Sequence, residues 1–226
     1  MIKNLLNLFF PKVCYGCNYL LSDNERHICT SCRHRLPLTN YHYEDDKTVE
    51  KVFYGRVKIE NATALLRFQK KGIVQQLLHN LKYRGHETIG KVLGGWLGTE
   101  LKQCKPYEDV DVVIPVPLHK TKLRKRGYNQ VSSFAKEIAT ALNSDYMDDV
   151  LVKRKSTSTQ VFKKRWARWA STDTVFTIEN SNKIRGKHIL LVDDIITTGA
   201  TIESCAAMLQ KAKDVKISVA SMAIAE

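Results

Sequence analysis

Two adjacent aspartates and a threonine-rich turn lie close together in the segment 189–201, and their side chains could hold a ligand that carries a phosphate. The branched apolar run from Ile189 to Val192 predicts a strand that is buried on both faces. Asp193 and Asp194 follow this run, at the point where we expect the strand to leave the sheet. Because open α/β sheets bind ligands at that edge, the two carboxylates are candidate ligand contacts.

The turn that follows the aspartates has the composition of an anion-binding loop. It supplies hydroxyl groups, successive backbone N–H groups and a glycine that permits tight curvature. Apolar residues at helical spacing from 202 to 209 predict a helix directly after it, and a helix N-terminus binds anions. The alternative is an Asp-Asp helix cap beside an ordinary turn. The predicted phosphate-binding residues are Thr197, Thr198, Gly199, Ala200 and Thr201.

Strand, acids, turn and helix occur here in the order of the signature of type I phosphoribosyltransferases, which this segment resembles. The resemblance implies that Asp193 and Asp194 hold the ribose hydroxyls of phosphoribosyl pyrophosphate (PRPP) and that the turn grips its 5-phosphate. A departing pyrophosphate also needs magnesium, because negative charge grows on its oxygen as the bond to the ribose breaks. We therefore expect magnesium to bind together with PRPP.

A basic segment follows the predicted strand 111–115 at its C-terminal end. Five of the seven residues from Lys120 to Arg126 are cationic, so this segment could stabilise a departing pyrophosphate. For any single one of these cations, a solvated basic face is the alternative. The predicted pyrophosphate contacts are Leu118, His119 and Lys120, and the predicted nucleic-acid contacts here are Lys122, Arg124, Lys125 and Arg126.

A second basic segment, residues 153–169, lacks clear periodicity and contains two tryptophans among lysines and arginines. Aromatic surfaces beside cations fit single-stranded nucleic acid, and they equally fit a lid that keeps water away from a reacting sugar. In a third interpretation both tryptophans are buried in the core. Arg154 is the predicted catalytic residue of this segment. The predicted nucleic-acid contacts are Lys163, Lys164, Arg165, Trp166, Arg168 and Trp169.

Two C-x-x-C turns near the start of the sequence are separated by eleven residues. Each turn can direct two thiolates to one point, and two such turns complete a tetrahedral site that suits zinc. A segment of this size has too little apolar surface to fold alone, so we expect the zinc to be structural. A pair of local disulfides or a redox C-x-x-C is the alternative. The predicted zinc ligands are Cys14, Cys17, Cys29 and Cys32.

The composition predicts one main hydrophobic core with a small appendage. Of the 226 residues, 43% are hydrophobic, and 36 lysines and arginines against 23 acidic residues give a formal net charge of +13. This excess favours polyanionic partners such as phosphorylated metabolites or nucleic acid. The apolar stretch before Pro11 is too short to span a bilayer, so we expect no membrane insertion and a cytoplasmic protein.

Predicted helices, whose apolar residues recur at helical spacing in 74–81, 89–101, 131–142 and 202–209, alternate with predicted strands from residue 62 onward. This alternation indicates an α/β fold with a mostly parallel sheet flanked by helices on both faces. The predicted strands are 62–68, 111–115, 150–153, 189–192 and 215–220. We divide the chain into a four-cysteine element (1–40), a linker (41–61) and a phosphoribosyltransferase-like domain (62–226).

The complete set of motifs resembles the ComF family of competence-associated, phosphoribosyltransferase-like proteins. The motifs that carry this resemblance follow the family's order: the four cysteines, Leu81–Gly85, Pro115–Leu118, Arg126–Gln130, Arg154 with Thr157 and Gln160, and Asp193–Thr201. The resemblance implies a type I phosphoribosyltransferase-like core, an N-terminal zinc finger and a hood formed by the N-terminal part. It also implies a role in the uptake of single-stranded DNA during natural transformation, with a competence helicase as a candidate protein partner.

Two functions from different classes fit these features. The first is a magnesium-dependent phosphoribosyltransferase, acting in competence or in nucleotide metabolism unrelated to competence. The second is a non-catalytic module that binds single-stranded nucleic acid and keeps a PRPP pocket as a sensor. The sequence predicts neither the acceptor substrate nor the oligomeric state.

Overall fold

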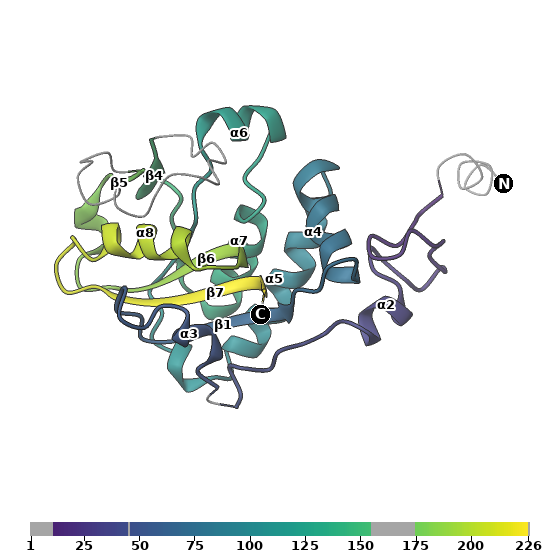
Figure 1. Cartoon of the computed structure of the whole chain (residues 1–226), viewed down its shortest axis with the longest axis horizontal. Coiled ribbons are helices and arrows are strands. Elements are labelled where there is room, and N and C mark those ends of the chain that lie inside the picture. Colours follow the sequence, from purple (N-terminus) through teal and green to yellow (C-terminus); the bar gives the residue numbers. More distant parts are fainter. Residues whose placement is uncertain (1–10, 45, 155–174, 226) are drawn as a thin grey trace.

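The computed structural model describes residues 11–44, 46–154 and 175–225. At its centre lies a five-stranded sheet with the order β1-β7-β6-β2-β3, in which every neighbouring pair of strands is parallel (Figure 1). The strands are β1 (Ala62–Arg67), β2 (Val112–Pro115), β3 (Asp145–Tyr146), β6 (His188–Ile196) and β7 (Lys216–Ile224). The prediction of a parallel sheet flanked by helices is confirmed.

Three helices cover one face of the sheet, namely α4 (Ile73–Tyr83), α5 (Thr88–Leu101) and α7 (Ser132–Leu142). Their buried residues recur at helical spacing, which is why the sequence predicts them. The helices α5 and α7 pack with their backbones close together. A Cβ atom on residue 94 would lie 2.5 Å from the carbonyl oxygen of Phe134, so only glycine permits this approach.

The other face carries α8 (Ala200–Leu209), the short helix α3 (Thr48–Lys51) and a separate antiparallel pair of strands. This pair consists of β4 (Leu151–Lys153) and β5 (Phe176–Ile178). The prediction that residues 150–153 join the parallel sheet is wrong. Leu151–Lys153 pair with β5 instead, and Val150 and Leu151 pack in the hydrophobic cluster on the α8 face. These apolar residues are therefore buried without belonging to the main sheet.

The basic segment after β2 forms the seven-residue helix α6 (Lys120–Arg126). Gly127 ends this helix in the left-handed conformation, with a φ of 81°. Two 3₁₀ helices, Lys105–Tyr107 and Ser181–Ile184, lie in the connections that lead to β2 and β6. No helix in the described part of the chain is long and apolar enough to cross a bilayer.

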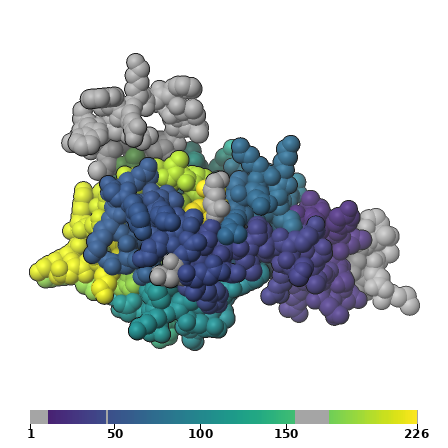
Figure 2. Space-filling model, turned by 60° about the horizontal axis from the view of Figure 1, so that its bottom comes forward, coloured from purple at the N-terminus to yellow at the C-terminus, as the bar shows by residue number. Residues whose placement is uncertain are grey.

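Residues 11–40, which include helix α2 (Thr30–His34), form one end of the molecule beside α4 and α5 (Figure 2). Their buried cysteines belong to the same hydrophobic cluster as α4 and α5. The segment 41–61, predicted as a linker, contains α3 and buries Val49 and Phe53 in the cluster on the α8 face. The division into domains stays a prediction, although this segment takes part in the core.

Candidate functional site

The C-terminal ends of β2 and β6 lie next to each other where the strand order changes direction. From β2 the chain passes through α7 to β3 on one side, and from β6 it passes through α8 to β7 on the other. Ligands of open α/β sheets bind at this kind of position. The N–H of Val116 donates to the carbonyl oxygen of Val192 at 2.8 Å, which holds the segment after β2 against β6 directly before Asp193.

Asp193 and Asp194 lie within β6 and not beyond its end. The prediction that the strand ends at Val192 is wrong, because β6 stays paired with β7 as far as Ile196. Since side chains alternate along a strand, the two carboxylates point to opposite faces of the sheet. Asp193 lies on the side of α8, and Asp194 lies on the side of α4 and α7. Both residues are buried, with 9% and 6% of their surface exposed.

Asp193 lines a small cavity together with the threonine-rich turn. The cavity has a volume of about 40 Å³ and is bounded by Asp193 and residues 195–202. A space of this size holds a few waters or a small anion. Burial, together with the negative charge of Asp194, raises the pKa of Asp193 from 3.8 to about 8. Without a ligand, this carboxyl therefore holds its proton at neutral pH.

The turn presents its polar groups at the N-terminus of α8. Thr197, Thr198 and Thr201 are exposed, and Gly199 precedes the helix with a φ of 73°. The first N–H groups of a helix have no partner within it, and the helix dipole favours an anion beside them. The turn and the helix can therefore bind a phosphate with backbone N–H groups and threonine hydroxyls.

The residues after α3 cover this turn from outside. A Cβ atom on residue 199 would lie 2.6 Å from Val52 Cγ1 and 2.9 Å from Phe53 Cε1. Arg56 adds a cation, because its guanidinium donates to the carbonyl oxygen of Thr198 at 2.7 Å and lies 3.6 Å from Glu203. The segment predicted as a linker therefore brings apolar packing and positive charge to the candidate phosphate site.

Asp194 is held by polar side chains from two other elements. The Nζ of Lys82, at the end of α4, lies 3.0 Å from Asp194 Oδ2. The side-chain amide of Gln130 donates to the same oxygen at 2.7 Å and accepts from Arg126 at 2.6 Å. These contacts connect the carboxylate to the basic helix α6.

The predicted pyrophosphate contacts lie at the start of α6. Leu118 and His119 are half-buried and Lys120 is exposed. The ring of His119 caps α6, since its Nδ1 accepts a hydrogen bond from the N–H of Thr121 at 3.3 Å. The hydrogen bond from Val116 to Val192 keeps these residues near the aspartates of β6. Their contact with pyrophosphate stays a prediction.

Among the described residues, Arg154 contacts β5 and the residue after it, and it does not contact the aspartates. Its guanidinium donates to Thr177 Oγ1 at 3.2 Å and to Glu179 Oε1 at 2.7 Å, and the side chain is 60% exposed. The neighbouring Lys153 lies closer to the site. Burial and the positive charge of Lys122 lower its pKa, while the charge of Asp193 acts in the opposite direction. Of the two described residues of this segment, Lys153 is therefore the one whose charge acts on Asp193.

The remaining predicted nucleic-acid contacts divide into two groups. Lys122, Arg124 and Lys125 are exposed on α6, and Arg126 is half-buried. Among the described residues, Lys122 and Lys125 have no acidic side chain within ion-pair distance. The other group lies outside the described residues and consists of Lys163, Lys164, Arg165, Trp166, Arg168 and Trp169.

The four N-terminal cysteines meet at one point. The Sγ atoms of Cys14, Cys17, Cys29 and Cys32 all lie within 4.8 Å of one another, and those of Cys17 and Cys29 are 3.8 Å apart. Zn–S bonds of about 2.3 Å place tetrahedral sulfurs about 3.8 Å apart, so the cluster has the dimensions of a zinc site. Burial raises the pKa of Cys14, but N–H donors from Cys29 and Gly16 outweigh it and bring the pKa to about 7. The cluster can hold a metal ion.

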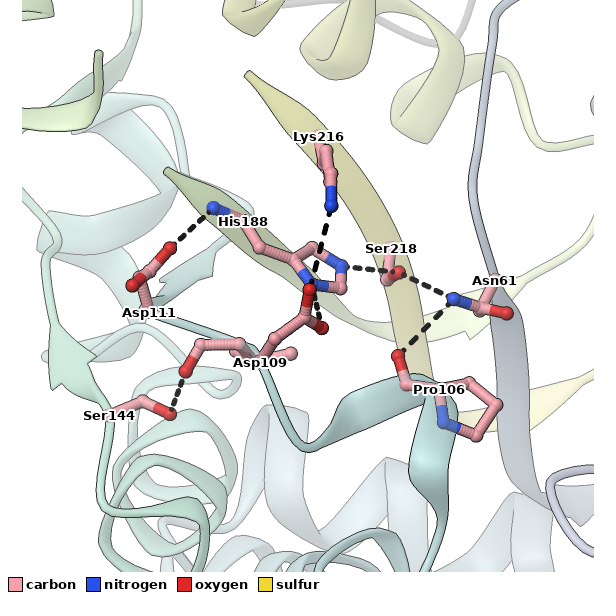
Figure 3. Close-up of polar contacts among 9 residues, drawn as sticks. Asn61, Pro106, Asp109, Asp111, Ser144, His188, Lys216 and Ser218 are labelled. Carbon is pink, nitrogen blue, oxygen red and sulfur yellow. Dashed lines mark hydrogen bonds and ion pairs between the residues drawn. The ribbon is translucent and has the colours of Figure 1, made fainter. Parts of the chain in front are cut away.

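A second polar cluster lies at the opposite end of the strands (Figure 3). His188 Nδ1 is 2.7 Å from Asp109 Oδ1, and His188 Nε2 is 2.8 Å from Ser218 Oγ. This chain of contacts has the order of a hydrolase triad, but Ser218 is fully buried, so no substrate reaches its hydroxyl. The cluster instead joins β6 and β7 to the segment before β2.

Comparisons with known proteins agree with this geometry. The family model "Phosphoribosyl transferase domain" matches residues 132–225. The chain is 34% identical to "Competence protein ComFC" of Streptococcus pneumoniae over 60% of its own length and 57% of that protein. It is 27% identical to the Bacillus subtilis protein of the same name over 92% of its length and 82% of the relative. These matches support the assignment of the chain to the ComF family.

The chain is also similar to further proteins and solved structures. "DNA utilization protein YhgH" of Escherichia coli K12 is 26% identical over 59% of each chain. The chain thus spans about three fifths of the length of the pneumococcal and E. coli relatives. A solved structure of "the allosteric regulatory enzyme of purine biosynthesis" matches 62% of the chain and 29% of that protein, with 20% identity and a TM-score of 0.42. Adenine phosphoribosyltransferase from Leishmania donovani covers 79% and 81%, with 12% identity and a TM-score of 0.39.

Four residues of the site were not predicted from the sequence: Arg56, Lys82, Gln130 and Lys153. Lys82 and Gln130 belong to motifs that carry the family resemblance, and this was the available signal for them. Lys153 stands directly beside Arg154, the residue that the sequence predicts as catalytic. Nothing in the sequence distinguishes Arg56 from other surface cations, because its role depends on the packing of α3 against the turn at 197–201.

Proposed function

We propose that this chain binds PRPP at the C-terminal ends of β2 and β6 and acts as a phosphoribosyltransferase-like protein in natural competence. One observation carries the proposal: Asp193 and the turn at 197–201 line a single cavity at the N-terminus of α8. A carboxyl group and a set of free N–H groups at that spacing suit a ligand with hydroxyls near one phosphate. A ribose 5-phosphate has this chemistry.

In this proposal each part of PRPP has its own contacts. The 5-phosphate binds the N–H groups and hydroxyls of residues 197–201, and Asp193 and Asp194 accept hydrogen bonds from the ribose hydroxyls. Lys120 and Lys153 offer positive charge to the pyrophosphate, and Arg154 keeps its predicted catalytic role. Magnesium, when bound with PRPP, neutralises part of the charge that develops on the leaving group.

The proposed metal of the N-terminal element is zinc, in a structural role. Four thiolates at tetrahedral distances favour zinc over the oxygen-seeking magnesium. The backbone N–H groups that donate to Cys14 Sγ and Cys29 Sγ stabilise thiolate charge. A bound zinc would hold residues 11–40 in the shape that packs against α4 and α5.

The relatives named for competence and for DNA utilization support a role with DNA. From the family resemblance, the proposal adds that this DNA is single-stranded, that the role is cytoplasmic and that a competence helicase is a partner. A specific observation supports contact with nucleic acid, namely the exposed cations of α6 beside the candidate PRPP site. The second candidate function is therefore a non-catalytic module that binds nucleic acid and uses PRPP as a signal. A nucleotide-metabolism transferase unrelated to competence is the third.

Isothermal titration of PRPP with magnesium tests the proposal directly. We expect wild-type protein to bind PRPP, and Asp193→Asn with Asp194→Asn to bind it at least tenfold more weakly. Asp23→Asn, the same type of substitution at an exposed position of the N-terminal element, serves as the control and should bind like the wild type. Equal affinity in all three proteins, or no binding to the wild type, contradicts the proposal.

Release of pyrophosphate separates the enzyme from the sensor. If the chain is a transferase, PRPP and a suitable acceptor should yield pyrophosphate. The variant that carries Asp193→Asn and Asp194→Asn should release none. If wild-type protein binds PRPP but releases none with nucleobases, amines or single-stranded DNA, the non-catalytic function is favoured. Malachite green detection after pyrophosphatase treatment provides the measurement.

A further inference from the structure

A cavity of about 310 Å³ lies between the end of α4 and the helix α6. Its size falls at the lower end of the range for small-ligand pockets, about 300–1,000 Å³. None of the described residues that line it is acidic. Its walls include Lys82, Tyr83, Lys122, Lys125, Arg126 and Tyr128. Four cations around one space select an anion.

Two aromatic rings, those of Tyr83 and Tyr128, also line this cavity, so it can bind a base as well as an anion. Tyr83 is 64% exposed, and the guanidinium carbon of Arg126 lies 5.4 Å from the centroid of its ring. The hydroxyl of Tyr128 donates to the carbonyl oxygen of Leu81, which attaches this wall to α4. A held aromatic ring beside a cation is a stacking surface for a base, and the lysines beside it can bind the phosphates.

Lys82 belongs both to this cavity and to the candidate PRPP site. Its Nζ lies 3.0 Å from Asp194 Oδ2, and its side chain is 20% exposed, so it reaches the carboxylate and the cavity. Arg126 provides a parallel connection through Gln130 to the same oxygen of Asp194. An anion in the cavity therefore competes with Asp194 for the charge of Lys82.

We infer that this cavity is a nucleotide subsite for single-stranded nucleic acid, with a base on Tyr83 and phosphates on Lys122 and Lys125, and that Lys82 couples it to the PRPP site. A strand phosphate draws Lys82 away from Asp194, which frees that carboxylate to accept a ribose hydroxyl. Nucleic acid and PRPP should then strengthen each other's binding by the same factor. The coupling rests on the proposed binding of PRPP, whereas the subsite deepens the proposed role with nucleic acid and does not depend on PRPP.

The subsite is tested by fluorescence anisotropy with labelled fifteen-nucleotide oligo(dT), oligo(U) and a duplex of equal length. Tyr83→Leu should weaken oligo(dT) binding about fivefold or more, because stacking on the ring is lost. Tyr19→Leu, at a position that is 77% exposed on the N-terminal element, is the matched control and should bind like the wild type. Lys122→Gln with Lys125→Gln should weaken binding at least tenfold and make it less dependent on salt. The tighter of the two single strands identifies DNA or RNA as the ligand.

The same anisotropy series can overturn the subsite. Equal binding by Tyr83→Leu and Tyr19→Leu contradicts it, and so does duplex binding as tight as single-strand binding, since paired bases cannot stack on Tyr83. Circular dichroism of each variant checks that it is folded. All of these variants lie outside the aspartates and the turn at 197–201, so their results are independent of PRPP.

The coupling is tested with a thermodynamic cycle of PRPP with magnesium and oligo(dT). In wild-type protein, saturating oligo(dT) should increase PRPP affinity about fivefold or more, and PRPP should increase oligo(dT) affinity by the same factor. Lys82→Met should reduce this factor to one. Lys102→Met, at an exposed position directly after the C-terminal end of α5, is the control and should leave the factor unchanged. If wild-type protein binds both ligands independently, the inference fails although the proposed function stands. If it binds no PRPP, the proposed function itself fails.

Discussion

The ring of Phe53 packs against the backbone of Gly199, so closely that a Cβ atom on residue 199 would lie 2.9 Å from Phe53 Cε1. Phe53 is almost fully buried, and it comes from the segment between the cysteine element and β1. Gly199 precedes α8 with a φ of 73°, which favours glycine for a second reason. The shape of the candidate phosphate turn therefore depends on a residue almost 150 positions away in the chain.

Gly199→Ala should damage both the fold and the site. The left-handed conformation costs alanine about 1–2 kcal/mol, and the overlap with Val52 and Phe53 adds about 1–3 kcal/mol. Because the turn must shift to relieve the overlap, we expect PRPP affinity to fall more than tenfold. Gly186→Ala is the matched control, since Gly186 has a φ of 70° and open space around it. Urea denaturation and titration calorimetry should show a smaller loss of stability and unchanged affinity for the control.

Metal removal should affect the N-terminal element first. We expect one zinc per chain by atomic emission, and chelation or Cys14→Ser should release it and lower the melting temperature. The effect reaches α4, because the amide of Asn80 donates to the carbonyl oxygen of Tyr15 at 2.8 Å and a Cβ at Gly16 would lie 2.9 Å from Ile73 Cγ2. Cys104→Ala, at a cysteine outside the cluster, should keep its zinc. Full zinc content in Cys14→Ser would exclude this cluster as the metal site.

Asp193 should make the free protein less stable as the pH rises. Its pKa is about 8 in the folded chain against an ordinary value of 3.8, so the folded chain holds the proton more tightly than the unfolded chain. The associated stability is present below pH 4 and is lost as the pH rises through 8, with a slope of at most about 1.4 kcal/mol per pH unit. Asp193→Asn should therefore gain stability over the wild type at pH 8 relative to pH 5. Denaturation at both pH values measures this gain, and Asp23→Asn should show none.

The Ser218 cluster should act in stability and not in hydrolysis. Ser218→Ala leaves the buried His188 Nε2 without its hydrogen-bond partner, so we expect a loss of about 1–3 kcal/mol in the free energy of unfolding. PRPP affinity should stay unchanged, because the cluster lies at the opposite end of the strands from Asp193. An esterase activity in the wild type that disappears in Ser218→Ala would show that the buried serine does react.

Local residue patterns were sufficient for much of the fold. Apolar periodicity predicted α4, α5, α7 and α8, and branched apolar runs predicted β2, β6 and β7, because these elements bury long faces in one core. The same patterns did not predict the sheet to which β4 belongs or the residue at which β6 ends. The strand β4 belongs to a separate antiparallel pair, although apolar residues of the segment 150–153 are buried. The strand β6 continues through Asp193 and Asp194, two acidic residues at which a local pattern predicts its end.

The sequence by itself determined the chemistry that is available: four cysteines at metal-binding spacing, two aspartates before an anion-binding turn, and an excess of cations. Residue type and short spacing are local properties, so they could be recognised without coordinates. Only the tertiary structure decided which groups meet. It directed Asp193 and Asp194 to opposite faces of β6, paired Asp194 with Lys82, and brought Phe53 and Arg56 to the turn. These contacts join segments far apart in the chain, and they arise because packing around a shared sheet, rather than sequence proximity, sets the distances between side chains.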